Sequence, residues 1–172
     1  AARARAEQLK FLDSVRTSLA SSGVGKVLLT YIVRDDETVV ILTTPEAQSV
    51  KLIALGRKKL AERVLAFRSS IMNYRTTPEA ASRALGRDLY RQLIAPLDAE
   101  LRAAKAETLF VSADGPLRYL PFAALFDGEG FLIERYPVAI YTPAATTFRS
   151  DRPPPIARAE GLGVTKAVGG FQ

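Results

Sequence analysis

Short apolar segments rich in β-branched residues lie on both sides of two amphipathic helical segments, and this order limits the possible folds more than any other feature. Before the helices, the pattern predicts strands at residues 27–33, 38–43 and 49–53. After the helices, it predicts strands at 108–112 and 137–142. The order indicates an α/β domain with a mixed sheet, and the short turns between the first three strands predict an antiparallel meander.

The two helical segments have different patterns. In the first, apolar residues at steps of four, three and four predict one buried face, formed by Leu60, Val64, Phe67 and Ile71. In the second, leucines repeat every four residues from Leu85 to Leu101. Pro96 interrupts this run and predicts two helices or a kink, because a proline inside a helix costs ~3 kcal/mol. The start, Thr76-Thr77-Pro78-Glu79, predicts a threonine cap, a first-turn proline and a glutamate at capping-box distance.

The segments nearer the two ends of the chain complete the expected organisation. Apolar residues at helical spacing predict a helix over residues 4–20, and we expect residues 1–22 to be a linker helix that continues an upstream helical array. Residues 23–172 then form the α/β domain. Within it, residues 116–125 predict a short helix, and the turn at 128–130 leads into residues 131–135.

The last thirty residues predict further elements. We expect one or two helical turns at 144–150, a proline-rich surface loop at 151–160 and a strand that begins at Gly161. Because the chain stops seven residues after Thr165 in this strand, we expect the domain to be truncated.

The absence of cysteine and histidine limits the chemistry open to this chain. Without them it can form no disulfide, thiolate zinc site, catalytic triad or Cys–His dyad. Hydrophobic residues make up 48% and charged residues 24%, as in soluble globular proteins. No apolar run approaches the ~18 residues that span a bilayer, and no export signal is visible, so we expect a cytoplasmic protein without membrane contact.

Three patterns could carry carboxylate chemistry, Ser–Lys chemistry or phosphate binding, which need neither histidine nor cysteine. Each pattern has a simpler structural interpretation. The carboxylates Asp35, Asp36 and Glu37 could hold a hard cation, but successive side chains in a hairpin point in different directions. Nothing in the sequence brings Ser69-Ser70 and Lys58-Lys59 together as a Ser–Lys pair. Gly161-x-Gly163 lacks the third glycine and the lysine-serine pair of phosphate loops. We therefore predict no catalytic, cofactor-binding or metal-ligating residues, and no cofactor.

The net charge of +6 is concentrated in the front of the chain. Residues 1–73 hold 12 basic and 7 acidic side chains. Five of the basic residues can share the outer side of one helix: Arg57, Lys58, Lys59, Arg63 and Arg68. Such a face could bind nucleic acid or an acidic partner. We favour a solvated helix face, because no aromatic stacking pattern accompanies these residues.

The stretch from residue 108 to residue 146 resembles the CHAT domain family, the caspase-like domains often attached to tetratricopeptide repeats. The features that carry the resemblance are Leu109 and Val111 before Asp114-Gly115, Leu117 before Leu120-Pro121-Phe122-Ala123-Ala124-Leu125, Leu132-Ile133-Glu134 and Tyr141-Thr142-Pro143. Upstream, Leu28-Leu29-Thr30-Tyr31 and Leu89-Tyr90 with Leu93 and Pro96-Leu97 are similar to the front half of the family. The resemblance covers about residues 25–166.

The resemblance implies a partial caspase-like fold and a bacterial cysteine endopeptidase as the parent protein. Complete members of the family cleave peptide bonds with a histidine and a cysteine, and this sequence contains neither. The chain is therefore expected to be the non-catalytic front half. Its partners would be the missing C-terminal catalytic half, upstream helical repeats and the peptide substrate of the parent, with self-association through exposed apolar surface. The alternatives are a stand-alone protein-interaction module and, less favoured, a basic nucleic-acid-binding domain.

Overall fold

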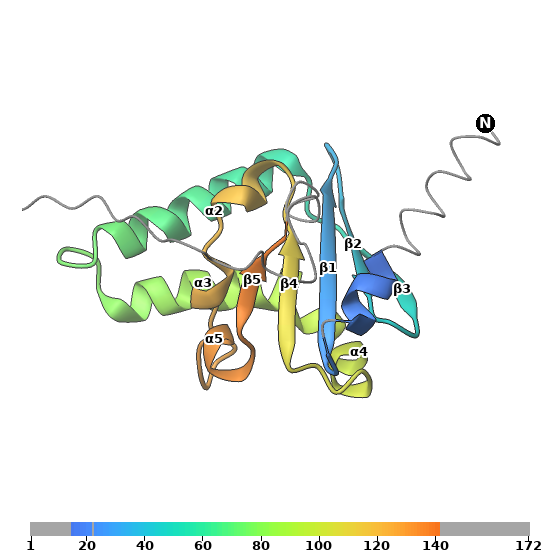
Figure 1. Cartoon of the computed structure of the whole chain (residues 1–172). Helices are drawn as coiled ribbons and strands as arrows, with labels where there is room; N and C mark the ends of the chain where they lie inside the picture. Colours follow the sequence, from blue (N-terminus) through green and yellow to red (C-terminus); the bar gives the residue numbers. More distant parts are fainter. Residues whose placement is uncertain (1–14, 22, 142–172) are drawn as a thin grey trace, which may run out of the picture. The chain divides into compact units, whose positions relative to one another are not determined.

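The computed structural model describes residues 15–21 and 23–141, which are built around a five-stranded mixed sheet with strand order β3-β2-β1-β4-β5 (Figure 1). The strands are β1 (Lys26–Val33), β2 (Thr38–Thr43), β3 (Gln48–Ile53), β4 (Thr108–Ser112) and β5 (Val138–Ile140). β1, β2 and β3 pair antiparallel, whereas β4 pairs parallel with both β1 and β5. The predicted mixed α/β class and the predicted meander are confirmed.

Several expectations concern residues outside the described part. They are the helix before residue 15, the helical turns at 144–150, the proline-rich loop at 151–160, and the strand and glycine pair that begin at residue 161. Residues 15–21, the described part of the first expected helix, are helical.

One face of the sheet packs against the helices α2 (Arg57–Met72) and α3 (Glu79–Leu93) (Figure 1). Strand alternation turns every second side chain of β1 toward these helices. The β1 residues in this core are Val27, Leu29, Tyr31 and Val33, and each is almost fully buried. Leu109 and Val111 of β4 continue the same buried row.

The buried face of α2 differs from the predicted one at its last position. Leu60, Val64 and Phe67 are buried as predicted, but Ile71 is 37% exposed and Ser70 lies inward in its place. The Ser70 hydroxyl donates a hydrogen bond to the Phe67 carbonyl oxygen, 2.7 Å away, so the serine can be buried without an external partner.

The predicted capping box at the start of α3 is wrong. Pro78 occupies the cap position, and no side chain from the described part of the chain caps the helix. The Thr76 hydroxyl instead donates to the carbonyl oxygen of Asn73, and the backbone N–H groups of Thr76 and Thr77 bond the same oxygen. Thr76 thus closes the end of α2, and the new helix begins at Glu79, too late for a capping box with Thr76.

The predicted interruption at Pro96 is confirmed. The chain leaves α3 at Leu93, forms the 3₁₀ turn η1 (Ala95–Leu97) and continues as the short helix α4 (Asp98–Ala103). The buried Leu93 carbonyl oxygen accepts a hydrogen bond from the Tyr31 hydroxyl at 2.9 Å. A side chain of β1 therefore donates to a carbonyl oxygen that has no helical partner at the end of α3.

Short helical turns join β4 to β5. The predicted short helix over residues 116–125 is present as two 3₁₀ turns, η2 (Gly115–Tyr119) and η3 (Phe122–Ala124), separated at Pro121. Residues 131–135, after the glycine turn, contain the one-turn helix α5 (Leu132–Arg135). The strand predicted at 137–142 is the shorter β5. No helix in the described ranges has the length and apolar character needed to cross a bilayer.

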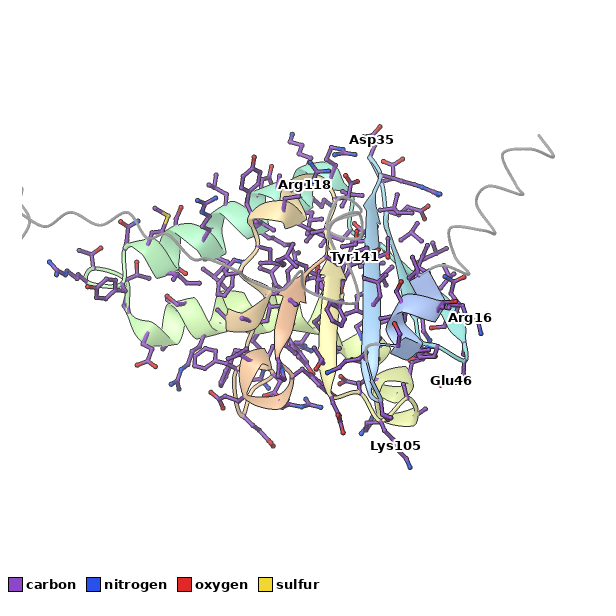
Figure 2. The ribbon with its side chains drawn as sticks, in the orientation of Figure 1. Arg16, Asp35, Glu46, Lys105, Arg118 and Tyr141 are labelled. Carbon is purple, nitrogen blue, oxygen red and sulfur yellow. The ribbon has the colours of Figure 1, made fainter. Side chains whose placement is uncertain are left out.

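Part of the second face of the sheet is covered by residues 15–21, which pack Val15 and Leu19 against Leu28 of β1. Arg16 fixes this segment to the β2–β3 turn, because its guanidinium donates to the carbonyl oxygens of Pro45 and Glu46, each at 2.9 Å (Figure 2).

An apolar patch lies farther along this face. We call Ile32, Val50 and Leu52 the open apolar patch, since Val50 is 58% and Leu52 68% exposed. The register places Ile32 and Leu52 on either side of Val39 in neighbouring strands, but Val39 itself is buried, so the exposed side chains of the patch come from β1 and β3.

Candidate functional site

The carboxyl ends of the parallel strands β1 and β4 lie at the same edge of the sheet, which is where ligands bind in many open α/β sheets. Asp114, just after β4, accepts a hydrogen bond from the backbone N–H of Val33 at the end of β1, with a distance of 3.1 Å. This side chain fixes the β4–η2 turn to the neighbouring strand and gives the edge a defined shape.

The first turn of α2 is fixed to the same edge. The backbone N–H of Arg57 donates to the Arg34 carbonyl oxygen at 2.9 Å, and its guanidinium donates to the Val33 carbonyl oxygen. Gly56 permits this approach, because a Cβ atom there would lie 1.9 Å from the Asp35 carbonyl oxygen. The start of the helix, the end of β1 and the turn after β4 therefore form one connected unit.

A groove of about 630 Å³ runs between α2 and η2 beside this unit. The α2 wall includes Arg57, Ala61, Leu65 and Arg68, and the η2 wall includes Pro116 and Tyr119. Leu65 and Tyr119 are largely exposed, and the Arg68 guanidinium carbon lies 5.6 Å from the centre of the Tyr119 ring. No carboxylate from the described residues lines the groove. The groove thus combines an apolar surface with cationic ends and forms the candidate site.

The structure places two of the three carboxylates of the β1–β2 turn, Asp35 and Glu37, beside arginines. Glu37 forms an ion pair with Arg34 at 2.8 Å, and Asp35 lies 3.7 Å from Arg57. Within residues 15–21 and 23–141, no three histidine, cysteine, aspartate or glutamate side chains gather as a possible metal site.

Ser69-Ser70 and Lys58-Lys59 lie in α2, near its two opposite ends. Ser70 is buried and bonded within its own helix, whereas both lysines are exposed. The structure thus does not bring the serines and lysines together. The pair Gly161-x-Gly163 lies outside the described residues.

A polar cluster beside α5 was not found by sequence reasoning. The Tyr90 hydroxyl donates to Asp98 at 3.1 Å and accepts from Arg135 at 3.1 Å. Arg135 also bonds Asp127 at 3.1 Å, whose second oxygen accepts the N–H groups of the following glycine turn. An aspartate before the sequence Gly-Glu-Gly is the local signal for such a turn.

The pKa values of this cluster are shifted. Burial, together with the adjacent Asp98 carboxylate, raises the pKa of Tyr90 to about 12. Burial opposes ionisation of Asp127, but hydrogen bonds from the backbone and from Arg135 outweigh it and lower the pKa of Asp127. The bonds of this cluster link α3, the glycine turn and α5, so we interpret it as structural.

Comparison with known proteins gives two findings about the whole chain. No curated protein matches it. A solved structure titled PilM-PilN type IV pilus biogenesis complex has a TM-score of 0.35 and 17% identity, and the alignment covers 83% of this chain and 45% of that chain. A similarity at this level supports no conclusion about fold or function.

A sequence model of the CHAT domain matches residues 83–170, just over half of the chain. The matched range begins in α3 and includes the groove wall formed by η2. The resemblance expected from the sequence began at about residue 25, and its part before residue 83 lies outside the match. The five-stranded mixed sheet with its helices is consistent with part of a caspase-like fold. The chain belongs to the CHAT domain family.

Proposed function

We propose that this chain is the non-catalytic front part of a caspase-like cysteine peptidase. One observation carries the proposal: a chain of the CHAT family contains no histidine and no cysteine. The resemblance implies a dyad of these two residues in complete members. The imidazole and the thiol must then come from another segment of polypeptide, and the part described here contributes structure.

The structural contribution has three parts in this proposal. The sheet extends that of the catalytic part, the edge formed by the ends of β1 and β4 shapes one side of the substrate cleft, and the N-terminal helix relays signals from upstream helical repeats. The open apolar patch supports such a role, because large exposed apolar side chains that gather on one face commonly mark an interaction site.

The deciding experiment is to determine the coding sequence that follows codon 172. The proposal expects an open frame that encodes a histidine and a cysteine, each just after a predicted strand. A stop codon there would overturn the proposal and favour a stand-alone interaction module.

A second measurement tests the chemistry of the complete product. The product of the whole frame is expected to hydrolyse members of a peptide library, and alkylation with iodoacetamide is expected to abolish this activity. The matched control is the 172-residue chain alone, which should be inactive before and after alkylation. Hydrolysis that survives alkylation of every thiol would contradict the peptidase assignment.

A further inference from the structure

The groove between α2 and η2 has surface properties that fit one class of partner. Its exposed apolar surface comes from Leu65, with Ala61 and Pro116 beside it. Its cationic groups are Arg57 and Arg68, which lie on the same side of α2 eleven positions apart. At 1.5 Å per residue, this separation is ~16 Å along the helix axis.

Among the residues that the structure describes, Arg68 is the groove cation without a carboxylate partner. No carboxylate of the described residues lies within ion-pair distance of it, whereas Arg63 in the same helix is paired with Asp88 at 3.2 Å. Its guanidinium lies over the Tyr119 ring. An arginine held against an aromatic ring keeps its N–H groups available for bidentate binding of a carboxylate.

We propose that this groove binds an extended acidic peptide segment. A carboxylate of the segment pairs with Arg68, and an adjacent apolar side chain packs on Leu65 and Pro116. An extended peptide advances ~3.3 Å per residue. A segment of about five residues therefore reaches from Arg68 to Arg57 along the groove.

A peptide fits this groove better than a nucleic acid does. Affinity for nucleic acid depends on several unpaired cations that neutralise successive phosphates. In this groove Arg57 already bonds the Val33 carbonyl oxygen and lies near Asp35, so Arg68 is the one of the two that no carboxylate in the described part of the chain neutralises. The apolar surface between them offers a nucleic-acid backbone no partner, but it suits an aliphatic side chain.

This inference concerns the described chain itself and does not rest on the proposed peptidase role. The test is a display selection in which random seven-residue peptides are selected on the immobilised chain. We expect the selected peptides to be enriched in an aspartate or glutamate next to an apolar residue. A selected peptide, labelled with fluorescein, is then titrated with the protein.

Two charge-neutralising variants distinguish the groove from the general basic surface. Arg68→Gln is expected to weaken binding of the labelled peptide at least tenfold, whereas Lys59→Gln should change it less than twofold. The second variant removes the same charge from an exposed position of the same helix, outside the groove. Circular dichroism checks that both variants retain the fold.

Three results would overturn the proposal. The first is a selection without acidic enrichment, and the second is equal weakening by the two variants. The third is tighter binding of a random-sequence DNA duplex than of the selected peptide, with the same loss in Arg68→Gln, which would assign the groove to nucleic acid.

Discussion

Replacement of Tyr31 by phenylalanine removes one hydroxyl group from the centre of the protein. The Tyr31 ring is almost fully buried, and its hydroxyl donates to the Leu93 carbonyl oxygen at 2.9 Å. No backbone N–H of the following turn can replace the Tyr31 hydroxyl as donor to the Leu93 carbonyl oxygen. The N–H of Leu97 already bonds the Ile94 carbonyl oxygen, and Pro96 has no N–H. The variant therefore leaves a buried acceptor at the end of α3 without a partner.

The expected loss of stability follows from that acceptor. A buried polar group left unsatisfied costs about 1–3 kcal/mol, whereas the ring itself still fills its site. We expect Tyr31→Phe to lower the free energy of unfolding by about 2 kcal/mol, which is roughly a 30-fold change in the unfolding equilibrium. Urea titrations followed by far-ultraviolet circular dichroism measure this change, and the slope against urea should stay the same.

Tyr119→Phe is the matched control, because it removes the same group from an exposed ring, and it should change stability by less than about 0.5 kcal/mol. A Tyr31→Phe variant that is as stable as this control would refute the reasoning.

Alkaline pH gives a second check on the same hydroxyl. Burial raises the pKa of Tyr31 above that of an exposed tyrosine, so the neutral phenol is favoured by the folded state. Its contribution to stability is complete below pH 10 and decreases as the pH rises above that value. The difference between the wild type and Tyr31→Phe should therefore become smaller above pH 10.

Three further outcomes are expected. Gly86→Ala should lower the free energy of unfolding by about 1 kcal/mol in a urea titration, because its Cβ would lie 3.0 Å from the buried Phe67 ring, and overpacking at about 1–3 kcal/mol outweighs the roughly 1 kcal/mol that alanine gains in a helix; a variant more stable than the wild type would contradict this contact. Tyr90 has its pKa raised to about 12, so its contribution to stability is present below pH 10 and is lost between pH 10 and 12. Urea titrations between pH 10 and 12 should show a smaller decrease in the free energy of unfolding for Tyr90→Phe than for the wild type. An equal decrease in both proteins would refute the contribution of the Tyr90 hydroxyl. Asp114→Ala removes the acceptor for the Val33 N–H and should cost about 1–2 kcal/mol and speed hydrogen exchange of that amide, and unchanged exchange would count against the proposed link.

The secondary structure could be predicted because its signals are local. The apolar, β-branched character of β1, the helical spacing of Leu60, Val64 and Phe67, and the effect of Pro96 each depend on residues near one another in the sequence. The errors arose where two elements meet. The Thr76 hydroxyl bonds the end of the previous helix, and this competing partner is not visible in the four residues of the expected capping box.

The groove could not be predicted for a different reason. Its walls come from residues 57–68 and 115–119. These segments meet because β1 and β4 pair in parallel, although two long helices separate the strands in the sequence. A parallel pair leaves no local signature of its partner. The bond between Tyr90 of α3 and Arg135 of α5 was missed because the two residues lie 45 positions apart in the sequence. The number of charges indicated the basic face of α2, but it could not show that Asp88 neutralises Arg63, whereas no carboxylate within residues 15–21 and 23–141 pairs with Arg68.

The row of buried leucines continues through the interruption at Pro96. Leu93 before η1, Leu97 within it and Leu101 after it are all completely buried. This makes the segment sensitive to length. Insertion of one residue in η1 would rotate all that follows by about 100°, because a helix has 3.6 residues per turn, and it would turn the last two leucines toward water. Natural variants should therefore tolerate insertions and deletions in the exposed α2–α3 connection but conserve the spacing across η1.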